Sequence, residues 1–181
     1  MMKWDTTTAK MHKNNAIVAF AVLAAMGSAC AISAHAASST GAIYTDSLQN
    51  GWQSWPWAKT VKLDNSAPVH SGSKSILVVG TAWQALSLNR TKTSSLGFKA
   101  LSFWIYGSGP TPQPIKVVGL TNNKAQKTVV LTPIAPKSWR HITLPLSQLG
   151  VANSPNLTGF WIQDAGGKGI SVVVDDVSLT P

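Results

Sequence analysis

Three tryptophans, Trp52, Trp55 and Trp57, lie within six positions of one another in the segment NGWQSWPW. An indole ring can fill a protein core or offer a flat apolar surface to a ligand. Because Pro56 cannot donate a ladder hydrogen bond, the segment is predicted to lie at a sheet edge or at the start of a strand. Burying all three rings in such a place is awkward. We therefore predict that Trp57 joins the core, while Trp52 and Trp55 contact a ligand.

Two further tryptophans, Trp104 and Trp161, occur in the alternating segments ALSFWIYG and LTGFWIQD. Successive side chains of a strand point to opposite faces. The phenylalanine and isoleucine on either side can thus fill the core while each tryptophan faces outward. If the two strands are neighbours, Trp104, Tyr106, Trp161 and Gln163 pave one outer sheet face. Packing of both tryptophans inside the sandwich is the equal alternative.

Exposed aromatic rings beside amide and carboxylate groups suit carbohydrate recognition. The apolar face of a pyranose covers the ring, and its hydroxyls bond to side chains such as Gln163 and Asp164. Covering half of a tryptophan of ~200 Å² at ~25 cal/mol/Å² contributes roughly 2.5 kcal/mol. Two such rings predict weak binding, roughly mM to μM. Trp83 and Gln84, at the start of another predicted strand, are further candidates for ligand contact.

Residues able to perform catalysis are few. Glutamate is absent and only five aspartates follow residue 36, whereas glycosidases usually need two acidic groups across the scissile bond. His70 and His141 lie far apart in the sequence and lack metal-ligand spacing. We predict that the protein is not an enzyme. The enzymatic alternative is a polysaccharide lyase, in which Arg140 or a lysine would neutralise a uronate.

The first 36 residues have the pattern of a secretory signal peptide. Three lysines precede an apolar run at residues 16–26, and AHA at 34–36 is a small-x-small cleavage pattern. Cleavage there removes Cys30, the only cysteine; lipidation of Cys30 is the alternative. We predict a protein secreted to the periplasm or the exterior, where it can associate with the cell surface. No membrane insertion is expected after cleavage.

The remaining chain is basic. Without the leader, twelve Lys and Arg residues and five Asp residues leave a net charge of +7. The positive residues are spread singly, which does not predict a nucleic-acid partner. A basic surface is attracted to anionic polymers and to an anionic cell envelope. The alternative function is therefore adhesion at the cell surface through a basic exterior.

Short β-rich segments recur about every ten residues after residue 42 and are separated by Gly, Pro, Asn and Ser. This spacing predicts an all-β, antiparallel sandwich or barrel. Residues 37–42 are predicted to be a flexible leader and residues 43–181 one domain. Strands are predicted at residues 57–63, 75–79, 84–89, 100–106, 115–121, 127–131, 139–144, 159–163 and 170–179.

Several of these segments together resemble the jelly-roll carbohydrate-binding modules of secreted glycan-processing proteins: YTDSLQNGWQSWPWA, VHSGSKSILV, AWQALSL, LSFWIYG, SWRHITLPLSQLGV, GFWIQD and VVVDDVSL. The match follows the chain in order from residue 44. It implies a galactose-binding-like β-sandwich, a monomer, and a polysaccharide or cell-surface glycan as partner. It also implies that Trp139 belongs to the framework.

The resemblance further implies a structural calcium ion. Alternation places Asp175 and Asp176 on opposite faces of the last strand, so one of them is predicted to point inward. A buried carboxylate is unfavourable unless it is paired or bound to a cation. Related modules tie such a final-strand aspartate to an N-terminal acidic residue, here Asp176 and Asp46. Calcium needs six to eight oxygens, so carbonyl or water oxygens would complete the site. A hydrogen-bonded pair without metal is the alternative.

Overall fold

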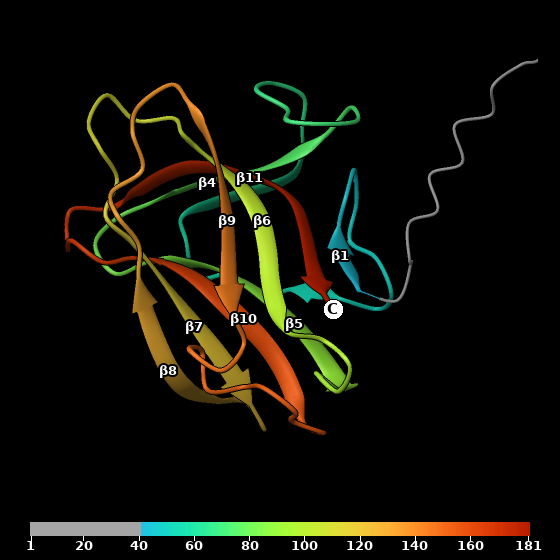
Figure 1. Cartoon of the computed structure of the whole chain (residues 1–181). Helices are drawn as coiled ribbons and strands as arrows, with labels where there is room; N and C mark the ends of the chain where they lie inside the picture. Colours follow the sequence, from blue (N-terminus) through green and yellow to red (C-terminus); the bar gives the residue numbers. More distant parts are fainter. Residues whose placement is uncertain (1–40) are drawn as a thin grey trace, which may run out of the picture. The chain divides into compact units, whose positions relative to one another are not determined.

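The computed structural model describes residues 41–181 (Figure 1). The predicted signal peptide and residues 37–40 of the predicted leader lie outside the described residues. Over residues 41–181 the chain forms eleven strands and no helix, which confirms the predicted all-β class. In this range no helix is long and apolar enough to cross a membrane. The strands are β1 (Ala42–Tyr44), β2 (Gln53–Ser54), β3 (Thr60–Asn65), β4 (Ser75–Gly80), β5 (Ala85–Thr93), β6 (Ala100–Gly107), β7 (Ile115–Thr121), β8 (Lys124–Val130), β9 (Trp139–Pro145), β10 (Leu157–Asp164) and β11 (Ile170–Thr180).

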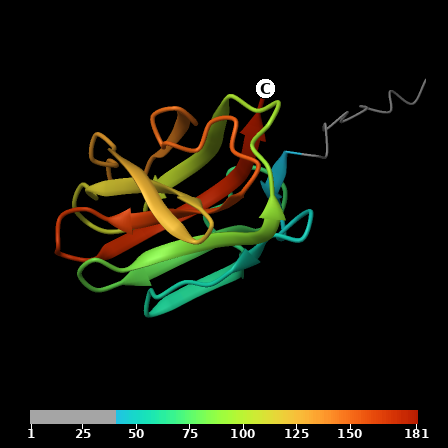
Figure 2. The ribbon, with the colours of Figure 1, turned by 90° about the horizontal axis from the view of Figure 1, so that it is seen from below.

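The strands form two antiparallel sheets. Sheet I has the order β3-β4-β11-β6-β9, with β1 added to β11, and sheet II has the order β2-β5-β10-β7-β8. In Figure 1, β9 and β6 stand side by side in one layer, while β8, β7, β10 and β5 fan out in the other. The view of Figure 2 shows the layers from below. From β4 onward the chain changes sheet at almost every connection, so strands close in sequence are seldom paired.

The core lies between the two sheets. Each long strand contributes alternate residues to it, for example Phe103 and Ile105 from β6 and Phe160 and Ile162 from β10, all fully buried. Tyr44 is also buried, and its hydroxyl donates to the carbonyl of Leu63 at 2.7 Å. Burial and the nearby aspartates raise the pKa of Tyr44 far above its ordinary value. The phenol is therefore a hydrogen-bond donor of the framework.

The two strands predicted as possible neighbours are not neighbours. β6 lies in sheet I between β11 and β9, and β10 lies in sheet II between β5 and β7. Trp104 and Tyr106 therefore face outward from one side of the sandwich, and Trp161 and Gln163 from the other. The expectation of one continuous aromatic face is wrong, because local alternation gives the face of a residue but not the sheet to which its strand belongs.

Candidate functional site

Four tryptophans gather on and beside the outer face of sheet II: Trp55, Trp57, Trp83 and Trp161. We call them the tryptophan surface. Trp55, Trp57 and Trp83 are 53%, 40% and 54% exposed, and Trp161 is half-buried. Trp57 meets Trp161 edge to face, with ring centroids 5.0 Å apart and an interplanar angle of 89°. Exposed rings of this size are uncommon unless they serve an interface or a ligand.

The backbone carbonyl of Trp83 joins the parts of this surface. It accepts a hydrogen bond from the indole nitrogen of Trp57 at 3.1 Å and one from the side-chain amide of Gln163 at 2.6 Å. The ring of Trp83 packs over Gly167, where an added Cβ would lie 2.8 Å from the indole. Segments distant in sequence thus hold the rings in place, so the surface is formed before any ligand arrives.

Small residues flank the central tryptophan. Trp161 of β10 is opposite Ser87 of β5 and Val118 of β7, and Gln163 is opposite Ala85 and Lys116. Ser87 and Val118 are both buried next to the indole. The ammonium of Lys116 lies 5.3 Å from the centre of the Trp83 ring, a cation–π distance. Lys116 was not a candidate from the sequence, although alternation in IKVVGLT places it outward.

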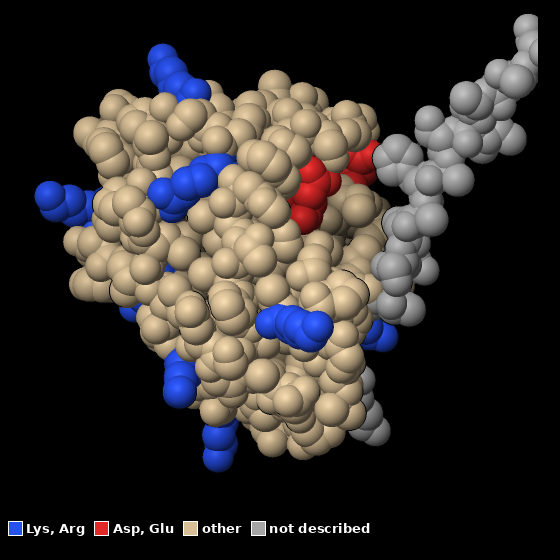
Figure 3. Space-filling view, in the orientation of Figure 1, with Lys and Arg blue, Asp and Glu red and all other residues tan. Residues whose placement is uncertain are grey.

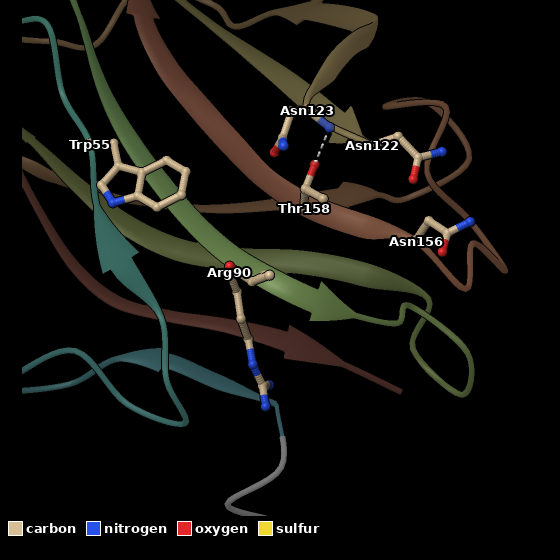
Figure 4. A pocket seen from close by; sticks show the side chains of 7 residues that line it. Trp55, Arg90, Asn122, Asn123, Asn156 and Thr158 are labelled. Atoms are coloured by element: carbon tan, nitrogen blue, oxygen red, sulfur yellow. Dashed lines mark hydrogen bonds between the residues drawn. The ribbon is translucent and has the colours of Figure 1, made fainter.

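An open hollow of about 290 Å³ continues the surface past Trp55. Figure 4 shows the indole of Trp55 across from Asn122, Asn123 and Asn156, with Thr158 close to Asn123. The backbone N–H of Asn123 donates to the Thr158 hydroxyl at 2.9 Å. The side chain of Arg90, which also lines the hollow, points away from Trp55 and the asparagines. Carboxamides facing an indole can donate to and accept from sugar hydroxyls.

The asparagines of this hollow were missed from the sequence, although a turn signal marks two of them. Asn122 and Asn123 join β7 to β8 in a two-residue hairpin turn, with φ of 51° and 59°. Such a turn requires left-handed backbone at both central residues, which asparagine tolerates. The same requirement places two carboxamides at the rim of sheet II.

Two of the predicted roles in NGWQSWPW are reversed. Trp52 is 5% exposed and stacks on Phe160 in the core, whereas Trp57 is exposed. Trp55 is exposed, as predicted. The sequence could not show which of Trp52 and Trp57 is buried, because β2 spans only two residues and is too short for alternation to indicate a direction.

Asp164, predicted to contact a sugar, is fully buried. Its carboxylate accepts hydrogen bonds from the backbone N–H groups of Trp83 at 2.9 Å, Gly166 at 3.0 Å and Gly169 at 3.3 Å. Gln84 is similar, since its side-chain oxygen accepts from the N–H groups of Lys59 and Thr81 at 2.8 and 3.1 Å. Both residues shape the loop that carries Trp83. Asp164 therefore belongs to the framework, contrary to the prediction.

The outer face of sheet I carries a different aromatic cluster. Trp104 is half-buried and stacks with His70 and His141 at centroid distances of 3.8 and 4.8 Å. Tyr106 and Trp139 pack on each other at 5.4 Å, and Trp139 also meets His70. These contacts take up ring surface that a sugar would need. The structure thus separates Trp104 and Tyr106 from the tryptophan surface.

The carboxylates predicted to bind calcium bond to the loop before β4. Asp46 accepts from the N–H groups of Ser73 and Lys74 at 2.6 and 2.7 Å, which lower its pKa. Asp176 accepts from His70 Nδ1 at 2.8 Å and from the Ser71 hydroxyl. Nowhere in residues 41–181 do three or more His, Cys, Asp or Glu side chains cluster as metal ligands. A calcium ion would need mostly carbonyl and water oxygens, and its binding stays a prediction.

The buried member of the aspartate pair is Asp175. It accepts from the backbone N–H groups of His70 at 2.9 Å and of Asp176 at 2.8 Å. Burial raises its pKa, and these N–H groups oppose the rise. A bulge in β11 with left-handed backbone at Asp176, φ 50°, accompanies the pair. One of the two carboxylates is thus buried, as predicted, but Asp175 is opposite the outward-facing Trp104 and lies on the outer face of sheet I, covered by the loop before β4, rather than pointing into the core.

Comparison with family models and with curated proteins finds no match. Solved structures do match. One is the family 11 carbohydrate-binding module of Clostridium thermocellum in complex with a β-1,3-1,4-mixed-linked tetrasaccharide: TM-score 0.55, 17% identity, 77% of this chain and 95% of that chain. Another is the CBM22-1 xylan-binding domain of Paenibacillus barcinonensis Xyn10C: TM-score 0.55, 14% identity, 77% and 90% covered.

The K3 adhesin domain of Lys-gingipain from Porphyromonas gingivalis also matches, with a TM-score of 0.53, 13% identity and 77% and 97% of the two chains covered. The chain therefore has the β-sandwich fold of carbohydrate-binding modules, as the sequence resemblance implies. Because an adhesin domain shares this fold, the function has to be argued from the surface.

Proposed function

We propose that this chain is a secreted, non-catalytic carbohydrate-binding protein whose ligand lies on the outer face of sheet II. The single observation that carries the proposal is the tryptophan surface, three of whose four rings are at least 40% exposed. A pyranose can cover an exposed indole, while Gln163 and the asparagines of the hollow supply polar partners. The carbohydrate-binding modules with the same fold support this reading.

The surroundings of Arg140 favour binding over catalysis. In a lyase Arg140 would face a uronate. Here its guanidinium donates to the backbone carbonyls of Thr132 and Pro133, and burial lowers its pKa. His141 contacts the hydroxyl of Ser102 at 2.8 Å. Both residues are on β9 of sheet I, apart from the tryptophan surface. Arg140 and His141, two groups that a lyase could use, are therefore not beside the proposed ligand surface.

Affinity electrophoresis through gels containing neutral β-linked glucans, xylan, mannan or galactan tests the proposal. Replacing Trp57 by Ala removes one stacking surface, which should cost about 2 kcal/mol, or roughly 30-fold in affinity. The variant Trp57→Phe keeps an aromatic ring and should retain part of the binding. Trp104→Ala, on sheet I, is the matched control and should bind like the wild type. Loss of binding in Trp104→Ala alone would move the site to sheet I, and retardation by no glycan would refute the function.

A further inference from the structure

The two sheets differ in charge. The strands of sheet II carry five Lys or Arg residues and one aspartate: Arg90, Lys92, Lys116, Lys124, Lys127 and Asp164. The strands of sheet I carry two basic and three acidic residues: Lys62, Arg140, Asp64, Asp175 and Asp176. The fifth aspartate of the described chain, Asp46, bonds to the loop before β4. Sheet II is thus the basic side of the sandwich.

No carboxylate is exposed on the strands of sheet II, because Asp164 is fully buried and accepts three backbone N–H groups. In the view of Figure 3, acidic atoms appear only in one area near β1, and the half that holds the fan of sheet II shows basic atoms alone. A ligand on this face meets amides, hydroxyls and cations. It meets no anion that would repel a negative charge.

Lys116 places a cation in contact with the tryptophan surface. It is opposite Gln163 of β10 and Val130 of β8, and its ammonium lies over the Trp83 ring. Within residues 41–181 the only ion pair is His70 with Asp176, so Lys116 has no carboxylate partner. An ammonium donates three hydrogen bonds and accepts none. The group that complements it best accepts hydrogen bonds and carries negative charge.

Resting on the proposed function, we propose that the tryptophan surface recognises an anionic polysaccharide, whose carboxylate or sulfate groups bind Lys116 while its pyranose rings stack on the tryptophans. The rings supply contacts that any pyranose can use. Lys116 supplies the selectivity, because only a charged substituent gains a charge-assisted hydrogen bond there.

Two matched pairs of polymers test this proposal: polygalacturonate with its carboxyl-reduced form, and dextran sulfate with dextran. Affinity electrophoresis at low salt should show about tenfold tighter binding of the charged member of at least one pair. The pair that shows it identifies carboxylate or sulfate as the recognised group. Lys116→Met should remove this preference, so that the charged and neutral members of the pair bind alike. Lys62→Met, on sheet I, changes the net charge equally and should keep the preference.

Three results would overturn the inference: equal binding of both members in both pairs, an equal loss in Lys62→Met and Lys116→Met, or no binding of any charged polymer. The second result would mean that net charge alone attracts the polymer. None of them decides the proposed function, which the neutral glycans and Trp57→Ala test separately.

Discussion

Trp83 has a left-handed backbone conformation, with φ of 64°. This conformation costs a non-glycine residue roughly 1–3 kcal/mol and persists only where the surroundings enforce it. The surroundings do so here: the Trp83 N–H donates to buried Asp164, and its carbonyl accepts from Trp57 and Gln163. Strain of this kind often accompanies a binding surface, since it holds a side chain where relaxed backbone would not.

Replacing Asp164 by Asn tests how this loop is held. An amide keeps one acceptor oxygen but presents an NH₂ group to N–H donors, so the buried N–H groups lose charge-assisted bonds. We expect a loss of about 1–3 kcal/mol in the free energy of unfolding, measured by urea denaturation. Asp64→Asn, at an exposed position of β3, is the control and should change stability by less than about 0.5 kcal/mol. Equal effects of the two changes would contradict a framework role for Asp164.

At the scale of elements, the loop of residues 68–74 is attached to β11 and to Asp46 by carboxylates. Backbone N–H groups lower the pKa of Asp46 below its usual 3.8. The unfolded chain then binds more protons than the folded chain between the two pKa values, so Asp46 adds stability that is present above about pH 4 and lost as pH falls through the lowered pKa. Asp175 acts oppositely, because its raised pKa makes its contribution decline as pH rises above 3.8.

Asp46→Asn should therefore make the stability of the protein depend less on pH in the acid range. We expect the variant to melt below the wild type at pH 6, and the difference between the two melting temperatures to shrink as the pH falls through the lowered pKa of Asp46. Thermal unfolding by circular dichroism across this range measures the difference. A difference in melting temperature that grows, rather than shrinks, as the pH falls would show that the carboxylate charge is not what holds the loop.

The predicted calcium site involves the same loop and can be tested by thermal unfolding. Binding of a ligand to the folded state alone raises the melting temperature with ligand concentration. If calcium binds at Asp46 and Asp176, millimolar calcium should raise the melting temperature of the wild type and EDTA should reverse the rise. Asp46→Asn should respond less than the wild type. No change with calcium would mean that the N–H groups of the loop satisfy these carboxylates without metal.

The positions of nine strands could be predicted, because alternation and turn residues are local signals. Their pairing could not. The tripeptide Phe-Trp-Ile occurs both in β6, at 103–105, and in β10, at 160–162, and the two copies lie in opposite sheets. Sheet membership depends on contacts between distant segments, so identical local patterns cannot reveal it. The short strands β1 and β2 were missed because three and two residues carry too little pattern.

The candidate site could be predicted only in part for the same reason. Of the residues predicted to contact a ligand, Trp55, Trp83 and Trp161 lie on the tryptophan surface and Gln163 lies beside them. Lys116 matters because it contacts Trp83, which lies 33 positions earlier in the sequence. Asp164 belongs to the framework because its carboxylate accepts hydrogen bonds from three N–H groups in two separate loops. Residue type and spacing indicated that tryptophans bind the ligand. The charge of the site could not be predicted, because it depends on which strands pair in sheet II.

At the scale of the whole molecule, two kinds of attraction compete to explain its function. The chain after residue 36 has a net charge of +7, and the fold is shared with an adhesin domain as well as with carbohydrate-binding modules. A basic exterior alone would adsorb to many anionic surfaces. Stacking on the tryptophan surface would depend on sugar shape and on the rings. Salt separates these attractions, because the Debye length falls from about 10 Å at 0.1 M to roughly 4 Å at 0.5 M.

We expect raising NaCl from about 0.1 to 0.5 M to release the protein from a carboxymethyl resin, where screened charge is the only attraction, and to weaken binding to a neutral glycan less than about twofold. Trp57→Ala should behave in the reverse way, keeping adsorption to the resin at low salt and losing the neutral glycan at every salt concentration. Retention on each matrix, measured by column elution at both salt concentrations, gives the comparison. If neutral-glycan binding disappears with salt and Trp57→Ala behaves like the wild type, charge-driven adhesion explains the surface better than sugar stacking does. If the two matrices respond differently, the rings and the charge act as separate attractions on one sheet.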